Sequence, residues 1–405
     1  MRQLIQVVIA LGLILVLHFS KQSLHHDSPS YFFFYNLFSC YELLILIVII
    51  SALLFQITIG KKYSARKSLL LGIVIPVVLL MIMEIICSYL LNHPKYIPAS
   101  VVRYFRVYNS QFDLNTFQGN PQACRYDSLL FYSIRPNARV FFSNREYADS
   151  FIINQKGFRA SENGSIRPQI ISVGDSYAMG LGVNQSQTYT SLLEQKTGLN
   201  TLNTGVSSYG TARESIGMRS IDTSDAKYVI WEYCSNDASE NKQYVEQNFQ
   251  YTPPGSSYFQ YLQAMNAWNV KYFPSKYFLT LLKILFRYKS GRNAQLSPQP
   301  KQLSAREQAI NFLEIIKQSP INFSNTKIIV FELDTYPIKS EFTDSLTMLL
   351  NEGKYKPLST CLLVVDMSGK LKKSDYYILD NHINASGHQV VADVLMNVIR
   401  DNKER

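Results

Sequence analysis

Three apolar stretches occupy the first quarter of the chain. Leu, Ile and Val dominate residues 4–19, 42–59 and 68–91. A helix needs about 20 such residues to cross roughly 30 Å of hydrocarbon. The second and third stretches reach that length; the first is shorter, but no small-residue cleavage site follows it, so we expect it to be retained. The pattern predicts a membrane anchor with three transmembrane helices at residues 1–92.

The charges of the loops predict how these helices are oriented. The loop at 20–40 has Lys21 as its single Lys or Arg, whereas four cations lie between the second and third stretches: Lys61, Lys62, Arg66 and Lys67. Basic loops stay on the cytoplasmic side. We therefore expect a cytoplasmic amino terminus, with everything after about Asn92 extracytoplasmic, either periplasmic or extracellular.

One carboxylate, Glu84, lies within the third apolar stretch. An ionisable residue inside a membrane helix is a functional hypothesis by default. Glu84 is also only about two turns from the outer end, where its side chain could reach interfacial water. Both interpretations remain open from the sequence.

Beyond the anchor, residues 93–168 form an aromatic, polar lead-in with strand-like runs at 139–142 and 151–153. A regular alternation of strands and helices follows it. This alternation predicts an α/β fold with three layers and a mainly parallel sheet, in which reactive residues collect at the carboxyl ends of the strands. Its expected strands are 169–173, 199–203, 227–233, 327–333 and 362–365, and its expected helices are 188–196, 212–219 and 388–400.

A long insertion at about 238–325 interrupts this rhythm within the predicted catalytic domain, 169–405. Helical periodicity recurs near its end at 305–317, and the stretch 277–287 is amphipathic. Such an amphipathic segment suits a lid or a membrane-surface helix, but we expect the simpler alternative, a helix packed on the sheet.

Composition narrows the classes of function. Of 405 residues, 47% are hydrophobic and 17% charged, which excludes a disordered chain. The net charge of +10 comes from scattered cations without a long basic run, so we expect no nucleic-acid partner. The five cysteines show no CxxC or metal-ligand spacing, and the histidines are dispersed, so we expect neither a metal nor a cofactor.

Ser176 is the candidate nucleophile. It follows the apolar run at 169–173 in the tripeptide Gly174-Asp175-Ser176, just before helix-compatible sequence. Backbone N–H groups at a helix amino terminus favour developing negative charge. By itself the tripeptide is also an ordinary turn and helix cap.

Two further strand ends carry possible hydrogen-bond donors. Gly205 follows one strand, and its lack of a side chain lets a backbone N–H approach a substrate oxygen closely. Asn236 follows the strand at 227–233 and can present a neutral amide N–H to the same oxygen. Simple turns are the alternative at both places.

Near the carboxyl end, His382 provides a candidate base and Asp380 provides the carboxylate that would orient it. A serine hydroxyl is a weak nucleophile until an imidazole accepts its proton, and a carboxylate must orient that imidazole. His388 is explained separately, as a residue of the last helix.

The four blocks, in this order, resemble the SGNH (GDSL-type) hydrolase superfamily, whose signature is Ser, Gly, Asn and His on an α/β fold. The stretch 153–159 looks like the lead-in of its membrane-tethered extracytoplasmic members. The resemblance implies that Ser176 is the nucleophile and His382 the base. It implies an oxyanion hole made of the Ser176 N–H with Gly205 and Asn236.

Two positions depart from the pattern of that superfamily. Cys234 stands where the third block usually has glycine. The fourth block is usually Asp-x-x-His, but Leu379 occupies the acid position and Asp380 is one residue closer to His382. Tethered members often carry this shorter form, so Asp380 is the expected acid, with Asp375 as the fallback.

These inferences predict an extracytoplasmic serine esterase or O-acyltransferase that acts through an acyl-serine. Its expected substrates are acyl groups, acetyl above all, on a cell-envelope glycan. Hydrolysis and transfer remain open; a transferase would need a membrane protein to deliver its acyl donor, because three helices are too few to carry acyl groups across the bilayer. The alternative is a catalytically silent glycan-binding or scaffold protein with the same fold.

Overall fold

The computed structural model describes residues 2–58, 65–160, 167–289 and 303–403. The chain forms two compact units. Unit 1 comprises Met1–Asn115 and Tyr261–Pro298, and unit 2 comprises Thr116–Gln260 and Gln299–Arg405. The predicted insertion at 238–325 therefore contributes a long stretch to the unit that holds the amino-terminal helices.

Unit 1 is helical, and two of its helices are long and apolar enough to cross a membrane. These are α2 and the part of α3 from Leu70 to Asn92; the apolar part of α1, Val8–Gln22, is shorter. Among the described residues, two of the three predicted spans are thus long enough to cross a membrane. Residues 61–64 of the basic loop are not among the described residues. The helices are α1 (Arg2–Gln22), α2 (Tyr31–Thr58), α3 (Ala65–Asn92), η2 (Pro94–Tyr96), α4 (Val102–Phe112) and α10 (Lys276–Lys289), and α9 (Ser256–Asn269) begins in unit 2 and ends in unit 1.

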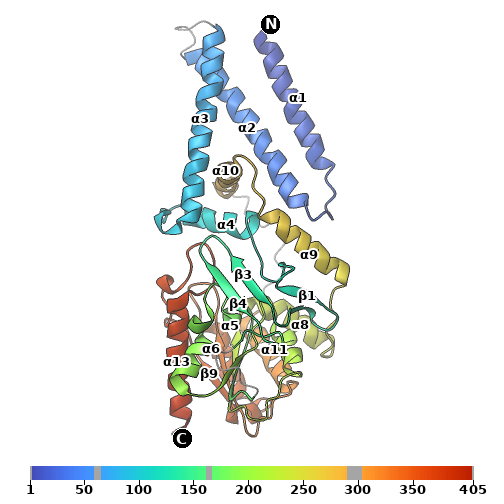
Figure 1. Cartoon of the computed structure of the whole chain (residues 1–405), viewed down its shortest axis with the longest axis vertical. Coiled ribbons are helices and arrows are strands. Elements are labelled where there is room, and N and C mark those ends of the chain that lie inside the picture. The colour runs from blue at the N-terminus through green and yellow to red at the C-terminus, as the bar shows by residue number, and fades with distance from the viewer. Residues whose placement is uncertain (1, 59–64, 161–166, 290–302, 404–405) are drawn as a thin grey trace. The chain divides into compact units, whose positions relative to one another are not determined.

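Helix α10 is the amphipathic segment of the insertion, and it packs on α2, α3 and α4 (Figure 1). Its buried Leu279 lies in one apolar cluster with Cys40 of α2 and Leu80 of α3. Asn36 of α2 also donates to Thr280 Oγ1 over 2.9 Å. The expectation of a helix packed on the sheet is therefore wrong: its apolar face is buried against the amino-terminal helices instead.

Glu84, the carboxylate within α3, binds the start of α10. Its oxygens accept the backbone N–H of Tyr277 at 3.2 Å and of Phe278 at 2.8 Å. They also accept the hydroxyl of Tyr272 at 3.1 Å. A carboxylate that satisfies the free N–H groups of a helix amino terminus is stabilising there. Glu84 therefore has a structural role that the sequence did not reveal.

Unit 2 is built on a five-stranded parallel sheet in the order β6-β5-β7-β8-β9. β5, β7 and β8 are rich in buried apolar residues, as expected for strands covered on both faces. The predicted α/β class is correct. The strands are β5 (Ile170–Val173), β6 (Thr201–Asn203), β7 (Tyr228–Tyr233), β8 (Lys327–Glu332) and β9 (Leu362–Val365).

Helices cover both faces of this sheet and make three layers (Figure 1). On one face, α7 (Thr211–Met218), α11 (Ala305–Lys317) and α12 (Glu341–Leu350) enclose a core around Trp231. On the other face, α6 (Tyr189–Thr197) and α13 (Ala385–Lys403) enclose a second core around Ile230. The sheet therefore fixes the positions of the loops at its carboxyl edge.

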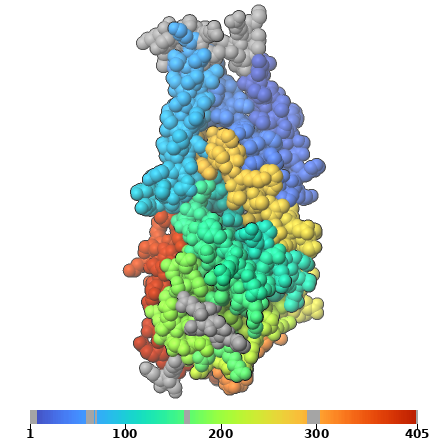
Figure 2. Space-filling model, viewed as in Figure 1, coloured from blue at the N-terminus to red at the C-terminus, as the bar shows by residue number. Residues whose placement is uncertain are grey.

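Two antiparallel hairpins precede the sheet in the chain. The first pairs β1 (Cys124–Asp127) with β2 (Phe131–Ile134), and the second pairs β3 (Arg139–Ser143) with β4 (Ala148–Ile152). These teal and green residues form part of the surface of unit 2 in Figure 2. The second hairpin is close to the strands predicted at 139–142 and 151–153, whereas the first was missed, as were α8 (Ala238–Glu246) and α12.

Candidate active site

Three segments follow the carboxyl ends of adjacent parallel strands. β5 lies between β6 and β7, so the residues after Val173, Asn203 and Tyr233 meet at one edge of the sheet. Ser176, Gly205 and Asn236 lie in these segments. The fold thus gathers three of the predicted site residues by strand order alone.

Ser176 is the first residue of the short helix α5 (Ser176–Met179). Asp175 caps this helix, because its Oδ1 accepts the backbone N–H of Tyr177 over 2.8 Å. The Ser176 N–H occupies the first helical position, where a helix offers no partner of its own. This places a backbone donor beside the Ser176 hydroxyl.

His382 joins Ser176 to Asp380. Its Nε2 lies 2.7 Å from Ser176 Oγ, across 206 residues of sequence. Its Nδ1 contacts Asp380 Oδ1, which also accepts the backbone N–H of His382 over 3.0 Å. With the imidazole proton on Nδ1, Nε2 is free to accept the serine proton. The structure therefore places the predicted hydroxyl, imidazole and carboxylate in one hydrogen-bonded chain.

The surroundings of this hydrogen-bonded chain shift the pKa values of both His382 and Asp380. Burial lowers the pKa of His382, but the charge and hydrogen bond of Asp380 outweigh burial and raise it above its usual value of 6.5. Burial raises the pKa of Asp380, yet the partnership with His382 brings it below its usual 3.8. The carboxylate thus favours a protonated imidazole, which a general base must become when it takes a proton.

Asn236 reaches the same place from the end of β7. Its amide Nδ2 donates to Asp175 Oδ2 over 3.2 Å, and the residue is exposed. A side-chain amide carries two hydrogens, so one remains for a substrate oxygen. The hydrogen bond ties Asn236 to the residue directly before Ser176.

Gly205 approaches α5 too closely for any side chain. A Cβ on Gly205 would lie 2.3 Å from Met179 N and 2.7 Å from the carbonyl carbon of Ala178. Its own N–H, however, donates to Asn203 Oδ1 over 3.0 Å. The glycine is therefore required for packing against α5, and its N–H already has a partner within the turn.

A turn between β3 and β4, which the sequence did not suggest, holds the Asp380 loop. The carboxylate of Glu146 accepts three consecutive backbone N–H groups, from Ile378 and Leu379 at 2.7 Å and from Asp380 at 2.8 Å. Hydrogen bonds to a charged acceptor are roughly twice as strong as neutral ones. Glu146 thus fixes the backbone that presents Asp380.

The same turn also contacts the Asp380 side chain. Asn144 Nδ2 donates to Asp380 Oδ2 over 2.8 Å, and the hydroxyl of Tyr147 donates to this oxygen over 3.3 Å. Asp380 therefore uses one oxygen for His382 and the other for the turn. We name Asn144, Glu146 and Tyr147 the acid clamp.

The fallback acid and the second histidine have other partners. Asp375 accepts the N–H of Lys372 and the hydroxyl of Ser386, each over 2.7 Å, and so orders the turn before α13. His388 is fully buried within α13, and its Nδ1 accepts the N–H of Tyr189 over 3.2 Å. Burial lowers the pKa of His388 to about 3, which keeps it neutral.

Buried carboxyl groups lie behind Ser176. The Asp175 N–H donates to Glu232 Oε2 over 3.2 Å, and Glu214 accepts the indole N–H of Trp231 over 2.6 Å. Burial, reinforced by neighbouring carboxylates, raises the pKa of Glu214, Glu232 and Asp237 well above the ordinary range. In the described residues, no group of three or more His, Cys, Asp or Glu side chains is arranged to hold a metal.

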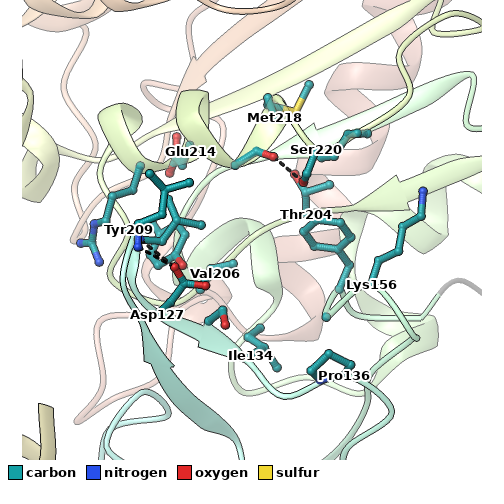
Figure 3. Close-up of a pocket in the computed structure, with 18 of the residues that line it drawn as sticks. Asp127, Ile134, Pro136, Lys156, Thr204, Val206, Tyr209, Glu214, Met218 and Ser220 are labelled. Carbon is teal, nitrogen blue, oxygen red and sulfur yellow. Dashed lines mark hydrogen bonds between the residues drawn. The ribbon is translucent and has the colours of Figure 1, made fainter. Parts of the chain in front are cut away.

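A cavity of about 290 Å³ borders the Gly205 segment (Figure 3). Thr204 and Val206, the neighbours of Gly205, line it together with Glu214 of α7 and Ile134 of β2. Figure 3 also shows Lys156 among the residues that surround this cavity. The hairpin β1–β2 thus closes a space next to the segment that supports α5.

Asp380→Asn will lower the pKa of His382 below 6.5. Burial, the largest influence on that pKa, lowers it, and without Asp380 only the smaller effect of the Asp175 carboxylate would oppose it. An NMR titration of the histidine ring protons will show this, with the His382 signal identified by its loss in His382→Gln. Asp375→Asn is the matched control and should leave the pKa raised; the reverse result would make Asp375 the acid.

Glu146→Ala will make the backbone N–H groups of the loop that presents Asp380 exchange faster with solvent. Losing three hydrogen bonds to a charged acceptor should speed amide exchange of Ile378, Leu379 and Asp380 by about 10- to 100-fold, given roughly 1.5–3 kcal/mol for such a bond. Hydrogen exchange with mass spectrometry measures this. Arg139→Ala, an exposed change on the same hairpin, is the control, and equal exchange in the two variants would contradict the clamp.

Comparison with known proteins finds no matching family model and no matching curated protein. Among solved structures, a lipolytic protein of the G-D-S-L family from Desulfitobacterium hafniense is 13% identical, with a TM-score of 0.31 over 56% of this chain and 98% of that one. A family two carbohydrate esterase from Clostridium thermocellum is 10% identical, with a TM-score of 0.35 over 61% and 66% of the two chains. The salicylyl-acyltransferase SsfX3 is 15% identical, with a TM-score of 0.30 over 57% and 54%. Because these similarities are distant, we base the functional proposal on the side-chain geometry of the chain itself.

Proposed function

We propose that the chain is a serine esterase or O-acyltransferase. The observation that carries this proposal is the hydrogen-bonded chain from Ser176 through His382 to Asp380, with 2.7 Å between Ser176 Oγ and His382 Nε2. That distance permits direct proton transfer. A hydroxyl, an imidazole and a carboxylate in this order activate serine for attack on an ester carbonyl.

In the proposed reaction, Ser176 Oγ bonds to the carbonyl carbon while its proton passes to His382 Nε2. The tetrahedral intermediate then collapses: the bond to the leaving oxygen breaks, and His382 returns the proton to that oxygen. An acyl-serine and an alcohol result. Water or a sugar hydroxyl next attacks the acyl-serine by the same steps, which gives hydrolysis or transfer and restores Ser176.

The negative charge on the intermediate needs donors. The Ser176 N–H, at the start of α5, and the second amide hydrogen of Asn236 are the proposed oxyanion hole. The Gly205 N–H would have to share its hydrogen between Asn203 Oδ1 and the substrate oxygen, because it already donates to the former. Gly205 is therefore the weakest of the three donors that the sequence suggested, and its packing against α5 is its firmer contribution.

We further propose an integral membrane enzyme whose unit 2 lies outside the cytoplasm and acts on acyl, above all acetyl, groups of a cell-envelope glycan. Two apolar helices long enough to span a bilayer support the anchor, and the cations between them support the orientation. The acceptor decides between hydrolysis and transfer, and a transferase would take its acyl group from a partner membrane protein.

Purified full-length protein in detergent will hydrolyse p-nitrophenyl acetate, and Ser176→Ala will reduce kcat/KM by at least about 1,000-fold. The rate should fall at acidic pH, with a midpoint above 6.5, because protonated His382 cannot accept the serine proton. Turnover that Ser176→Ala leaves intact would refute the nucleophile. Absence of turnover on this ester and on acetylated glycan would favour a silent glycan-binding or scaffold protein.

Alkaline phosphatase fused after Arg405 will be active in bacterial cells, because this reporter folds only outside the cytoplasm. The matched control is a fusion within the loop between α2 and α3, which should be inactive on the cytoplasmic side. Activity of the loop fusion with an inactive carboxyl-terminal fusion would invert the proposed orientation.

A further inference from the structure

A second hollow, of about 250 Å³, opens at the carboxyl ends of β7 and β8 in unit 2. Its polar lining comes from several elements: the segment after β7, the helix α11, the end of β8 and the loop that leads into α12. These polar residues include Ser235, Gln308, Glu332, Asp334, Lys339 and Glu341. We name this hollow the acidic pocket.

Glu332, the last residue of β8, is the unusual member of the lining. The residue is only 8% exposed. Within the described part of the chain, its carboxylate accepts no hydrogen bond and pairs with no cation. Removing a carboxylate from water carries a cost that a hydrogen-bonded or charged partner offsets. A partly desolvated carboxylate that lines a hollow is a candidate ligand-binding group.

The charges that face Glu332 are mostly of the same sign. Asp334 follows β8, Glu341 begins α12, and Asp366 follows β9; after burial, these three carboxylates raise the pKa of Glu332 to about 8. Lys339 is the cation of the lining, and its ammonium lies 3.7 Å from Glu341. The pocket is therefore acidic in a chain whose net charge is +10.

The acidic pocket adjoins the proposed active site. Ser235, which lines the pocket, directly precedes Asn236. Tyr336 lies between the lining residues Thr335 and Pro337, and its ring contacts the ring of Tyr376, with 5.7 Å between centroids. The next residue, Tyr377, binds the His382 loop, because its N–H donates to the His382 carbonyl over 3.0 Å. The pocket lining and the proposed active site therefore share the segment that follows β7.

We propose that the acidic pocket binds a primary ammonium group of the substrate, with Glu332 as its principal partner. An ammonium group supplies three donors and one positive charge, which match an unpaired carboxylate flanked by Asp334 and Glu341. A resident metal ion is less suited, since no ligand cluster exists among the residues described. The inference rests on the proposed function and narrows its substrates to amine-bearing esters or acceptors, such as amino sugars or aminoacyl esters.

Binding of an ammonium compound near pH 7 should release a proton from the pocket. With a pKa of about 8, Glu332 is largely protonated at that pH, and an ammonium partner favours its ionised form. Asp334, Glu341 and Asp366 face the same carboxyl group and act against its ionisation, so the cation relieves their repulsion as well. Proton release therefore reports on Glu332 and does not require catalysis.

The probe is ethanolamine, which is fully charged at pH 7, and ethylene glycol is its neutral counterpart. Calorimetric titration of the full-length protein in detergent, in buffers of different ionisation enthalpy, gives both the affinity and the number of protons released. We expect ethanolamine to bind at least tenfold more tightly than ethylene glycol and to release about one proton. Glu332→Gln should weaken ethanolamine at least tenfold and abolish the release.

Two variants keep the result interpretable. Asp334→Asn should weaken ethanolamine without abolishing proton release, and Glu352→Gln, which changes an exposed carboxylate paired with Arg306, should change neither. Equal affinity for both probes, unchanged binding in Glu332→Gln, or proton release by calcium chloride in place of ethanolamine would overturn the proposal. Ser176→Ala should bind ethanolamine normally, so loss of the esterase hypothesis and loss of the ammonium site are separate outcomes.

Discussion

The proposed chemistry depends on one constraint: Ser176 Oγ and His382 Nε2 must stay within proton-transfer distance although they belong to separate elements. The parallel sheet fixes the first atom, because β5 ends directly before α5. The second atom is on a loop before α13, and a loop is held only by what binds it. The acid clamp supplies that restraint, since Glu146 accepts three backbone N–H groups of the loop and Asn144 contacts Asp380 itself.

This arrangement gives the lead-in region a structural role that its amino-acid composition does not reveal. The turn between β3 and β4 carries the Glu146 carboxylate, which accepts three hydrogen bonds, and the Asn144 amide, which donates to Asp380. Functional geometry needs support from residues outside the reacting set, and rigid elements provide it better than loops. We therefore regard β3 and β4 as part of the support of the proposed active site.

The sequence predicted what depends on local pattern. The apolar runs of β5, β7 and β8 and the periodicity of α11 located these elements within about two residues, because buried parallel strands and amphipathic helices have strong signals. It did not predict that α2 begins at Tyr31, since an aromatic stretch broken by Asn36 does not resemble a membrane span. The packing of α10 on α2 and α3 could not be predicted from the sequence either, because an amphipathic helix does not reveal which apolar surface it will cover.

The candidate site shows the same division. Ser176, Gly205 and Asn236 could be located because each follows a predicted strand, and reactive residues collect at the carboxyl ends of parallel strands. The acid clamp could not, since its hydrogen bonds join residues more than 230 positions apart and leave no spacing signal. Glu332 is the complementary case: at the end of an apolar strand it resembles an ordinary surface carboxylate in sequence, and only the absence of a partner in the folded chain distinguishes it. Asp175, Asp375 and Asp380, in contrast, each accept several hydrogen bonds at the same edge of the sheet.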